Sequence, residues 1–153
     1  MRTKGQRRLV GSVVKIPLER EWHSYARVLP EPLCAFYDCR TRADLTVEEI
    51  VLKDVLFRLW VMNRALTSGR WEIVGKAPLS DGQLVAVPFF KQDALDPRKV
   101  SIYLDGKERP ATPAECSGLE RAAVWDPEHV EDRLRDHYLG QPNKWTQSLR
   151  LRV

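Results

Sequence analysis

The sequence lacks the features that mark several large classes of protein. No run approaches the roughly 18 apolar residues of a membrane-spanning helix, so we expect no membrane segment. No apolar run long enough for a signal peptide follows the basic N-terminus. The three cysteines, Cys34, Cys39 and Cys116, are too few and too scattered for a disulfide framework or a zinc site. We therefore expect a cytoplasmic protein whose cysteines are reduced and buried.

Motifs for catalysis are absent as well. The chain has no Gly-rich phosphate loop, no G-x-S-x-G elbow, no H-E-x-x-H and no paired C-x-x-C. His129 and His137 are metal-capable types, but about 80° separates them around a helix axis, which is poor geometry for a shared ion. A nucleophile drawn from Cys34 or Cys39 with His23 as its base rests on strand order alone. We expect no enzyme activity, no cofactor and no metal.

The net charge of +4 comes from the N-terminus. Residues 1–8 hold four of the 25 basic side chains and no acid, which leaves 21 basic and 21 acidic side chains in residues 9–153. A dedicated nucleic-acid-binding domain normally shows a clustered basic face, so this balance argues against nucleic acid as the partner. We expect residues 1–8 to be a basic, flexible terminus. Residues 9–153 are then a single domain, long enough to bury a core.

Alternating apolar positions predict a series of strands before the C-terminal third. The predicted strands cover residues 9–18, 22–29, 33–39, 55–62, 70–74, 83–90 and 100–104, with a last strand at 148–153. Glu19-Arg20-Glu21 is a charged turn that makes the first two strands a hairpin. Strands early and helices late indicate an α+β fold. We expect a strongly twisted antiparallel β-sheet or a partial barrel with C-terminal helices packed on it.

The clearest helix is predicted to start after Asp126. Asp126 is a good N-cap, Pro127 suits the first helical position, and Gly140 can end the helix in a left-handed conformation. The face expected to cover the sheet carries Val130, Leu134 and Tyr138. A capping box with proline at the first position, Thr112–Glu115, predicts a shorter helix ahead of it.

Two groups of polar residues are the candidate partner-binding sites. They are Glu128, Asp132 and Asp136 on the predicted helix, and Lys91, Gln92 and Asp93 after a strand. The three acids, here called the acidic ridge, are spaced four apart, where like charges repel mildly. Asp136 also lies near the helix C-terminus, where an anion is unfavourable, so the ridge breaks a local rule without visible compensation. Such a ridge suits docking to a basic partner surface, and a solvated charged face is the plainer alternative.

A series of motifs runs in order through residues 9–93. They are Val13-Val14-Lys15-Ile16-Pro17-Leu18, Tyr25-Ala26-Arg27-Val28-Leu29, Ala35-Phe36-Tyr37-Asp38, Leu56-Phe57-Arg58 through Met62, Gly69-Arg70-Trp71 and Pro88-Phe89-Phe90-Lys91-Gln92-Asp93. In this order they resemble the immunity protein 26 family of bacterial polymorphic toxin systems, and the C-terminal third fits a subgroup of it. Two positions depart from that pattern. Residues 19–23 stand where a glycine-containing turn is expected, and Ser12 stands where an acidic residue is common.

The resemblance implies a non-enzymatic immunity protein that binds a cognate toxin in the cytoplasm of the producing cell and blocks it. Because the body of the chain is balanced in charge, it carries a local acidic patch at most, or its toxin is not a nuclease. Two alternatives stay open: a small nucleic-acid-associated regulatory β-domain, and a ligand-binding protein whose tryptophans line an aromatic pocket. The sequence sets neither the toxin nor the oligomeric state.

Overall fold

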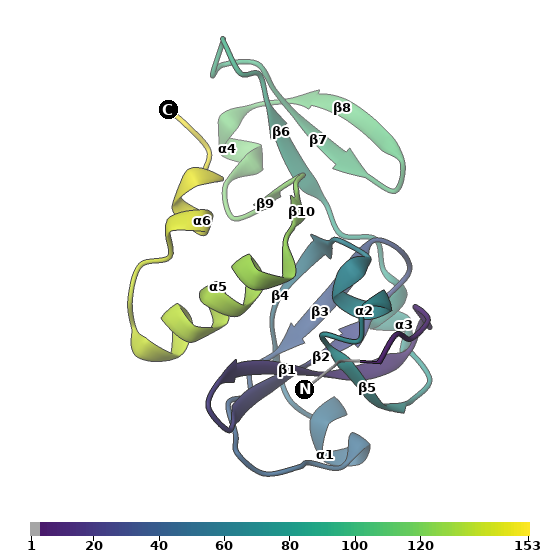
Figure 1. The fold of residues 1–153 in the computed structure, drawn as a ribbon. Helices are drawn as coiled ribbons and strands as arrows, with labels where there is room; N and C mark the ends of the chain where they lie inside the picture. Colours follow the sequence, from purple (N-terminus) through teal and green to yellow (C-terminus); the bar gives the residue numbers. More distant parts are fainter. Residues whose placement is uncertain (1–3) are drawn as a thin grey trace. The chain divides into compact units, whose positions relative to one another are not determined.

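The computed structural model describes residues 4–153 and divides the chain into two compact units (Figure 1). The first unit contains the chain up to Leu84 together with Val124–Asn143. The second contains Val85–Ala123 and Lys144–Val153. The chain therefore leaves the first unit, returns to add one short strand and one helix, and leaves again. The single domain expected over residues 9–153 stays a prediction beside this division.

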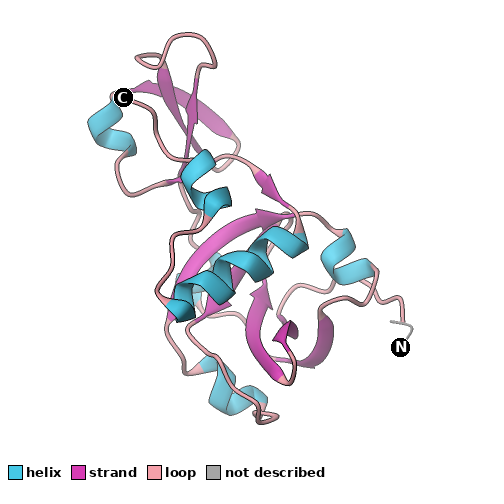
Figure 2. Ribbon diagram, turned by 60° about the vertical axis from the view of Figure 1, so that its left-hand side comes forward, coloured by secondary structure: helices cyan, strands magenta, loops and turns pink. Residues whose placement is uncertain are grey.

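The first unit is built on a mixed six-stranded sheet in the order β10-β4-β3-β2-β1-β5. Its strands are β1 (Ser12–Glu19), β2 (Trp22–Val28), β3 (Leu33–Tyr37), β4 (Val55–Val61), β5 (Glu72–Lys76) and β10 (Val124–Trp125). Its helices are α1 (Val47–Val51), α2 (Arg64–Thr67), α3 (Asp81–Leu84) and α5 (Pro127–Leu139). Neighbouring strands are antiparallel except that β10 pairs with β4 in parallel. Helix α5 crosses one face of this sheet and contacts β1 (Figure 2).

The second unit has a mixed four-stranded sheet in the order β8-β7-β6-β9. Its strands are β6 (Phe89–Gln92), β7 (Val100–Leu104), β8 (Lys107–Ala111) and β9 (Glu120–Arg121), and its helices are α4 (Pro113–Cys116) and α6 (Lys144–Ser148). Strand β9 runs parallel to β6, and the other pairs are antiparallel. A small core forms from Phe90, Val100, Ile102 and Cys116. This unit therefore has apolar packing of its own.

The core of the first unit lies along β1, β2 and β3. Apart from its first residue, each of β2 and β3 is buried along its whole length, and in β2 this burial includes the polar side chains of His23, Ser24 and Arg27. Helix α1 closes one side, and a β-carbon on Gly75 would overlap the Val47 side chain there. Strand β5 thus needs glycine at this close approach. Trp71 and Trp125 are buried, as tryptophans in a core are expected to be.

The local signals that predicted the main helices are confirmed. Helix α5 begins at Pro127 after Asp126 and ends at Gly140, whose φ is 67°. The Asp126 side chain makes no capping hydrogen bond, so its backbone conformation rather than its carboxylate marks the start. Thr112 and Glu115 form both halves of a capping box before α4.

The α+β class is confirmed, and the finer expectation of the fold is corrected. Within residues 4–153 neither sheet closes, so there is no partial barrel. The sheets are mixed rather than antiparallel, because β10 and β9 return as short parallel edge strands. The strand predicted at 148–153 is wrong: α6 ends at Ser148, and Arg121 holds the following segment by donating to the Leu149 and Arg150 carbonyls. The strand predicted at 83–90 begins only at Phe89, because α3 occupies residues 81–84.

Part of the predicted flexible terminus is bonded to the first unit. The Gln6 side-chain carbonyl accepts the Ile73 backbone N–H (3.2 Å). The Arg8 guanidinium donates to the carbonyls of Leu29 (2.6 Å) and Leu33 (3.1 Å). Residues 1–3 of the segment lie outside the described residues, and the flexibility of residues 1–8 stays a prediction.

A buried carboxylate on α5 joins this helix to the segment before β5. Glu131 is 2% exposed. Its Oε2 accepts from the buried Trp71 Nε1 (2.9 Å) and from Arg70 Nε (2.7 Å), while its Oε1 accepts from Arg70 Nη2 (2.8 Å). A carboxylate is stable in such a position only when several donors replace water. Glu131 therefore fixes where α5 lies on the sheet.

We expect Glu131→Gln to lower the free energy of unfolding by about 3 kcal/mol, because one partner of a buried charge pair is removed while Arg70 and Trp71 keep their donors. Urea denaturation measures this change. Asp132→Asn is the matched control on the same helix, since an exposed pair contributes less than about 1 kcal/mol. Equal effects of the two substitutions would contradict the anchoring role of Glu131.

Candidate partner-binding surfaces

Glu128, the first acid of the ridge, is bonded to α2 within the first unit. Its carboxylate accepts two hydrogen bonds from the Arg64 guanidinium (2.8 and 3.1 Å), and Arg70 Nε lies 3.8 Å away. The bond from Arg64 holds the pKa of Glu128 below its usual value. Both partners stay about half exposed, at 44% for Glu128 and 49% for Arg64. Solvent therefore screens the attraction between the two charges, and both side chains remain accessible to a partner.

The other two ridge acids also have partners in the first unit. Asp132 accepts from Arg135 Nη1 (2.8 Å), and Arg135 also donates from Nε to the Leu18 carbonyl at the end of β1 (2.8 Å). Asp136 accepts from the side-chain amide of Asn143 (2.8 Å). The three acids of the ridge thus lie on one helix, as predicted. Hydrogen bonds from Arg64, Arg135 and Asn143 offset the repulsion between their carboxylates.

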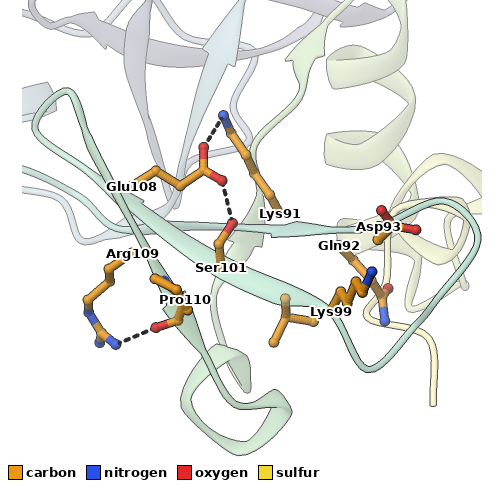
Figure 3. Close-up of a pocket in the computed structure, with 9 residues that line it drawn as sticks. Lys91, Gln92, Asp93, Lys99, Ser101, Glu108, Arg109 and Pro110 are labelled. Atoms are coloured by element: carbon orange, nitrogen blue, oxygen red, sulfur yellow. Dashed lines mark hydrogen bonds and ion pairs between the residues drawn. The ribbon is translucent and has the colours of Figure 1, made fainter.

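Lys91, Gln92 and Asp93 line a groove of about 480 Å³ in the second unit (Figure 3). Its other lining residues are Lys99, Val100, Ser101, Glu108, Arg109 and Pro110. Glu108 is the central anion: one oxygen pairs with Lys91 Nζ (2.9 Å) and the other accepts from the Ser101 hydroxyl (2.8 Å). The Lys91 ammonium, and then the Ser101 hydroxyl, lower the pKa of Glu108. The groove is a mixed-charge surface with cations on both walls.

Gln92 and Asp93 also hold the surrounding loops. Gln92 Nε2 donates to the Arg152 carbonyl (2.8 Å), and its Oε1 accepts the Arg152 N–H (2.9 Å). Asp93 Oδ1 accepts the backbone N–H groups of Leu95 (2.8 Å) and Asp96 (2.9 Å), which shapes the loop between β6 and β7. These two backbone bonds, that of Asp96 first, lower the pKa of Asp93. Lys91 is therefore the member of this group whose charge points to the groove.

A third polar surface surrounds the turn between β1 and β2, which the sequence analysis described only as a charged turn. Trp22 begins β2, and the Arg40 and Arg42 guanidinium carbons lie 3.8 and 5.5 Å from its ring centre. Arg42 also pairs with Glu21 (2.8 Å). A groove of about 560 Å³ runs beside them, and Arg20, Glu21, Trp22 and Arg42 help to line it. The sequence signal that could have identified this surface is arginine close to tryptophan in a polar turn, because both residue types are enriched in protein interfaces.

The described residues do not favour a cysteine nucleophile or a metal site. Burial raises the pKa of the Cys34 thiol to about 11, so the thiol stays protonated and is a poor nucleophile. Within residues 4–153 no three His, Cys, Asp or Glu side chains are placed to hold a metal ion. In the same part of the chain, no helix has the length and apolar character needed to cross a membrane.

Comparison with known protein families gives a match to the family described as immunity protein 26, over residues 10–101. The matched range runs from the residues before β1 to the second residue of β7. It includes the turn between β1 and β2 and residues 91–93, and it ends before α5. Searches of curated proteins and of solved structures found no match.

The lowered pKa of Glu128 predicts how its pair with Arg64 depends on pH. A carboxyl with a lower pKa in the folded chain stabilises it above the unfolded value of 4.5, and this contribution is lost as the pH falls through the folded pKa. We expect Glu128→Gln to lower the melting temperature by about 1 °C at neutral pH, and the difference to vanish well below pH 4.5. Calorimetry at both pH values checks this, with Glu31→Gln as the exposed control. A difference that persists in acid would contradict the pairing.

Proposed function

The chain belongs to the immunity protein 26 family and is an immunity protein that neutralises a cognate toxin, and we propose that it does so in the cytoplasm of the producing cell by covering the toxin. The match over residues 10–101 carries the family and the neutralising role, since it extends over more than half of the chain. Members of such a family act by binding rather than by catalysis. The toxin's own activity is then blocked by occupation of its surface.

We propose the acidic ridge as one part of the interface. Glu128 and Asp132 are 44% and 43% exposed, so their carboxylates remain within reach of a basic toxin surface. Exposed ion pairs contribute little to folding, and a partner's cation can join them at small cost. Charges at such positions act mainly on association rate and orientation. The ridge would steer the toxin rather than supply most of the affinity.

We propose the groove around Lys91 as a second contact. Lys91 is 45% exposed, and its pair with Glu108 leaves both charges open to solvent. Lys91, Gln92 and Asp93 lie inside the range matched by the family, whereas the ridge lies beyond it. The groove offers both a cation and an anion to a partner, which favours a polar toxin segment.

Neutralisation is tested by co-expression with the cognate toxin. We expect cells that make both proteins to survive and cells that make the toxin alone to die, because binding blocks the toxin. Colony counts measure the protection, and a catalytically inactive toxin is the control for toxicity. Equal killing with and without this chain would rule out the proposed function.

The ridge is tested by reversing its charges. We expect Glu128→Lys, Asp132→Lys and Asp136→Lys together to raise the Kd for the inactive toxin about tenfold or more, mainly by slowing association. Biolayer interferometry at low and high salt measures this, and thermal melting reports on folding. The matched control reverses three exposed acids elsewhere in the first unit, namely Glu31, Glu48 and Asp54. If both triple variants bind equally, the ridge is not part of the interface.

A further inference from the structure

Arg20, in the turn between β1 and β2, has an unfavourable backbone conformation. Its φ is 51°, in the left-handed region that glycine adopts freely and an arginine adopts only at a cost. Within residues 4–153 the only other non-glycine residue with positive φ is Asp105, which precedes Gly106 in a turn where aspartate is common. Arginine has no such local preference. A residue kept in this conformation without a local reason points to a use for its side chain.

The charge of Arg20 is also unused within the described chain. The flanking acids pair with other arginines, Glu19 with Arg40 (3.2 Å) and Glu21 with Arg42 (2.8 Å). Arg20 is exposed and has no ion pair among residues 4–153. Because the acids on either side of it in the sequence pair with other arginines, Arg20 presents a cation without an ion pair, among residues 4–153, at the tip of the hairpin.

An aromatic side chain lies next to this cation. Trp22 has Arg40 stacked 3.8 Å from its ring centre, an arrangement that holds the ring in place. Arg42, 60% exposed, stands further along the same ring. The groove of about 560 Å³ beside them is lined by Arg20, Trp22 and Arg42 together. Tryptophan and arginine are the residue types that most often carry binding energy in interfaces.

We infer that this turn is a docking surface for an acidic segment of the toxin, in which Arg20 pairs with a carboxylate and Trp22 anchors an adjoining side chain. The inference rests on the proposed function and adds the chemistry of the partner to it. An anion is the complement because four cations line the groove, Lys15, Arg20, Arg42 and Arg70, against three acids, Glu21, Asp44 and Glu72. Arg20 has no ion pair among residues 4–153, and desolvating it without a counter-ion would oppose binding. The turn therefore recognises the opposite charge to that expected of the acidic ridge.

The decisive variant is Arg20→Gly, because glycine suits the left-handed backbone and leaves the turn intact. We expect its melting temperature to equal or exceed that of the wild type, while its Kd for the catalytically inactive cognate toxin rises about tenfold. Arg20→Glu should weaken binding further, and both should reduce the salt dependence of association. Asp105→Gly is the control for the same backbone change in another turn, and Arg7→Gln for the loss of one exposed cation. Both controls should bind like the wild type.

Trp22→Ala provides a second measurement, with an expected rise in Kd of about thirtyfold for loss of an aromatic anchor. If the wild-type chain binds and protects cells, but Arg20→Gly and Arg20→Glu bind within about twofold of it, the docking surface is wrong and the immunity function stands. If the wild-type chain neither binds nor protects, the immunity function fails and the docking surface fails with it. Tighter binding of Arg20→Glu would mean that the surface meets a basic segment, which also overturns the inference.

Discussion

The Glu131 carboxylate is the constraint on which the first unit depends. It is buried beneath α5, where it is satisfied by Trp71 and by both donors of the Arg70 fork. An unpaired carboxylate at this depth would cost several kcal/mol, so helix and sheet keep one relative position. With Glu131 turned inward, Glu128 and Asp132 are left on the solvent side of α5. The acidic ridge is thus exposed as a consequence of how the helix is anchored.

Pairing of charge also organises the surfaces of both units. Most exposed acids with a shifted pKa have a basic side chain as the main cause, as for Glu128 with Arg64 and Glu108 with Lys91. Such exposed pairs add little stability, but they leave the surface nearly neutral in local charge. Against that background Arg20, which has a costly backbone conformation and no ion pair in the described part of the chain, is a stronger indication of a binding surface than a cluster of paired acids. Charged side chains that form no ion pair within the folded chain are therefore better indicators of a binding surface than charged side chains that do.

Local signals account for what was predicted well. The N-terminus of α5 at Pro127 and its end at Gly140 follow from residues within one turn of each boundary. The first three strands follow from alternating apolar positions interrupted by short turns. The parallel edge strands β9 and β10 have two residues each, too short for any periodicity, and they pair across long stretches of chain. The division into two units could not be predicted from local sequence either. No local residue pattern marks the points where the chain leaves one unit and enters the other.

The sequence by itself determined the α+β class, the boundaries of α5 and the family, because these depend on residue order over short distances. Only the tertiary structure decided which charges are used. Glu131 and Arg70 are 61 residues apart, and Glu128 and Arg64 are 64 apart, so no local rule pairs them. For the same reason, the turn first described as a charged connection proved to contain one cation, Arg20, that has no ion pair within residues 4–153. Coulomb interactions depend on distance in space, which the order of residues does not state.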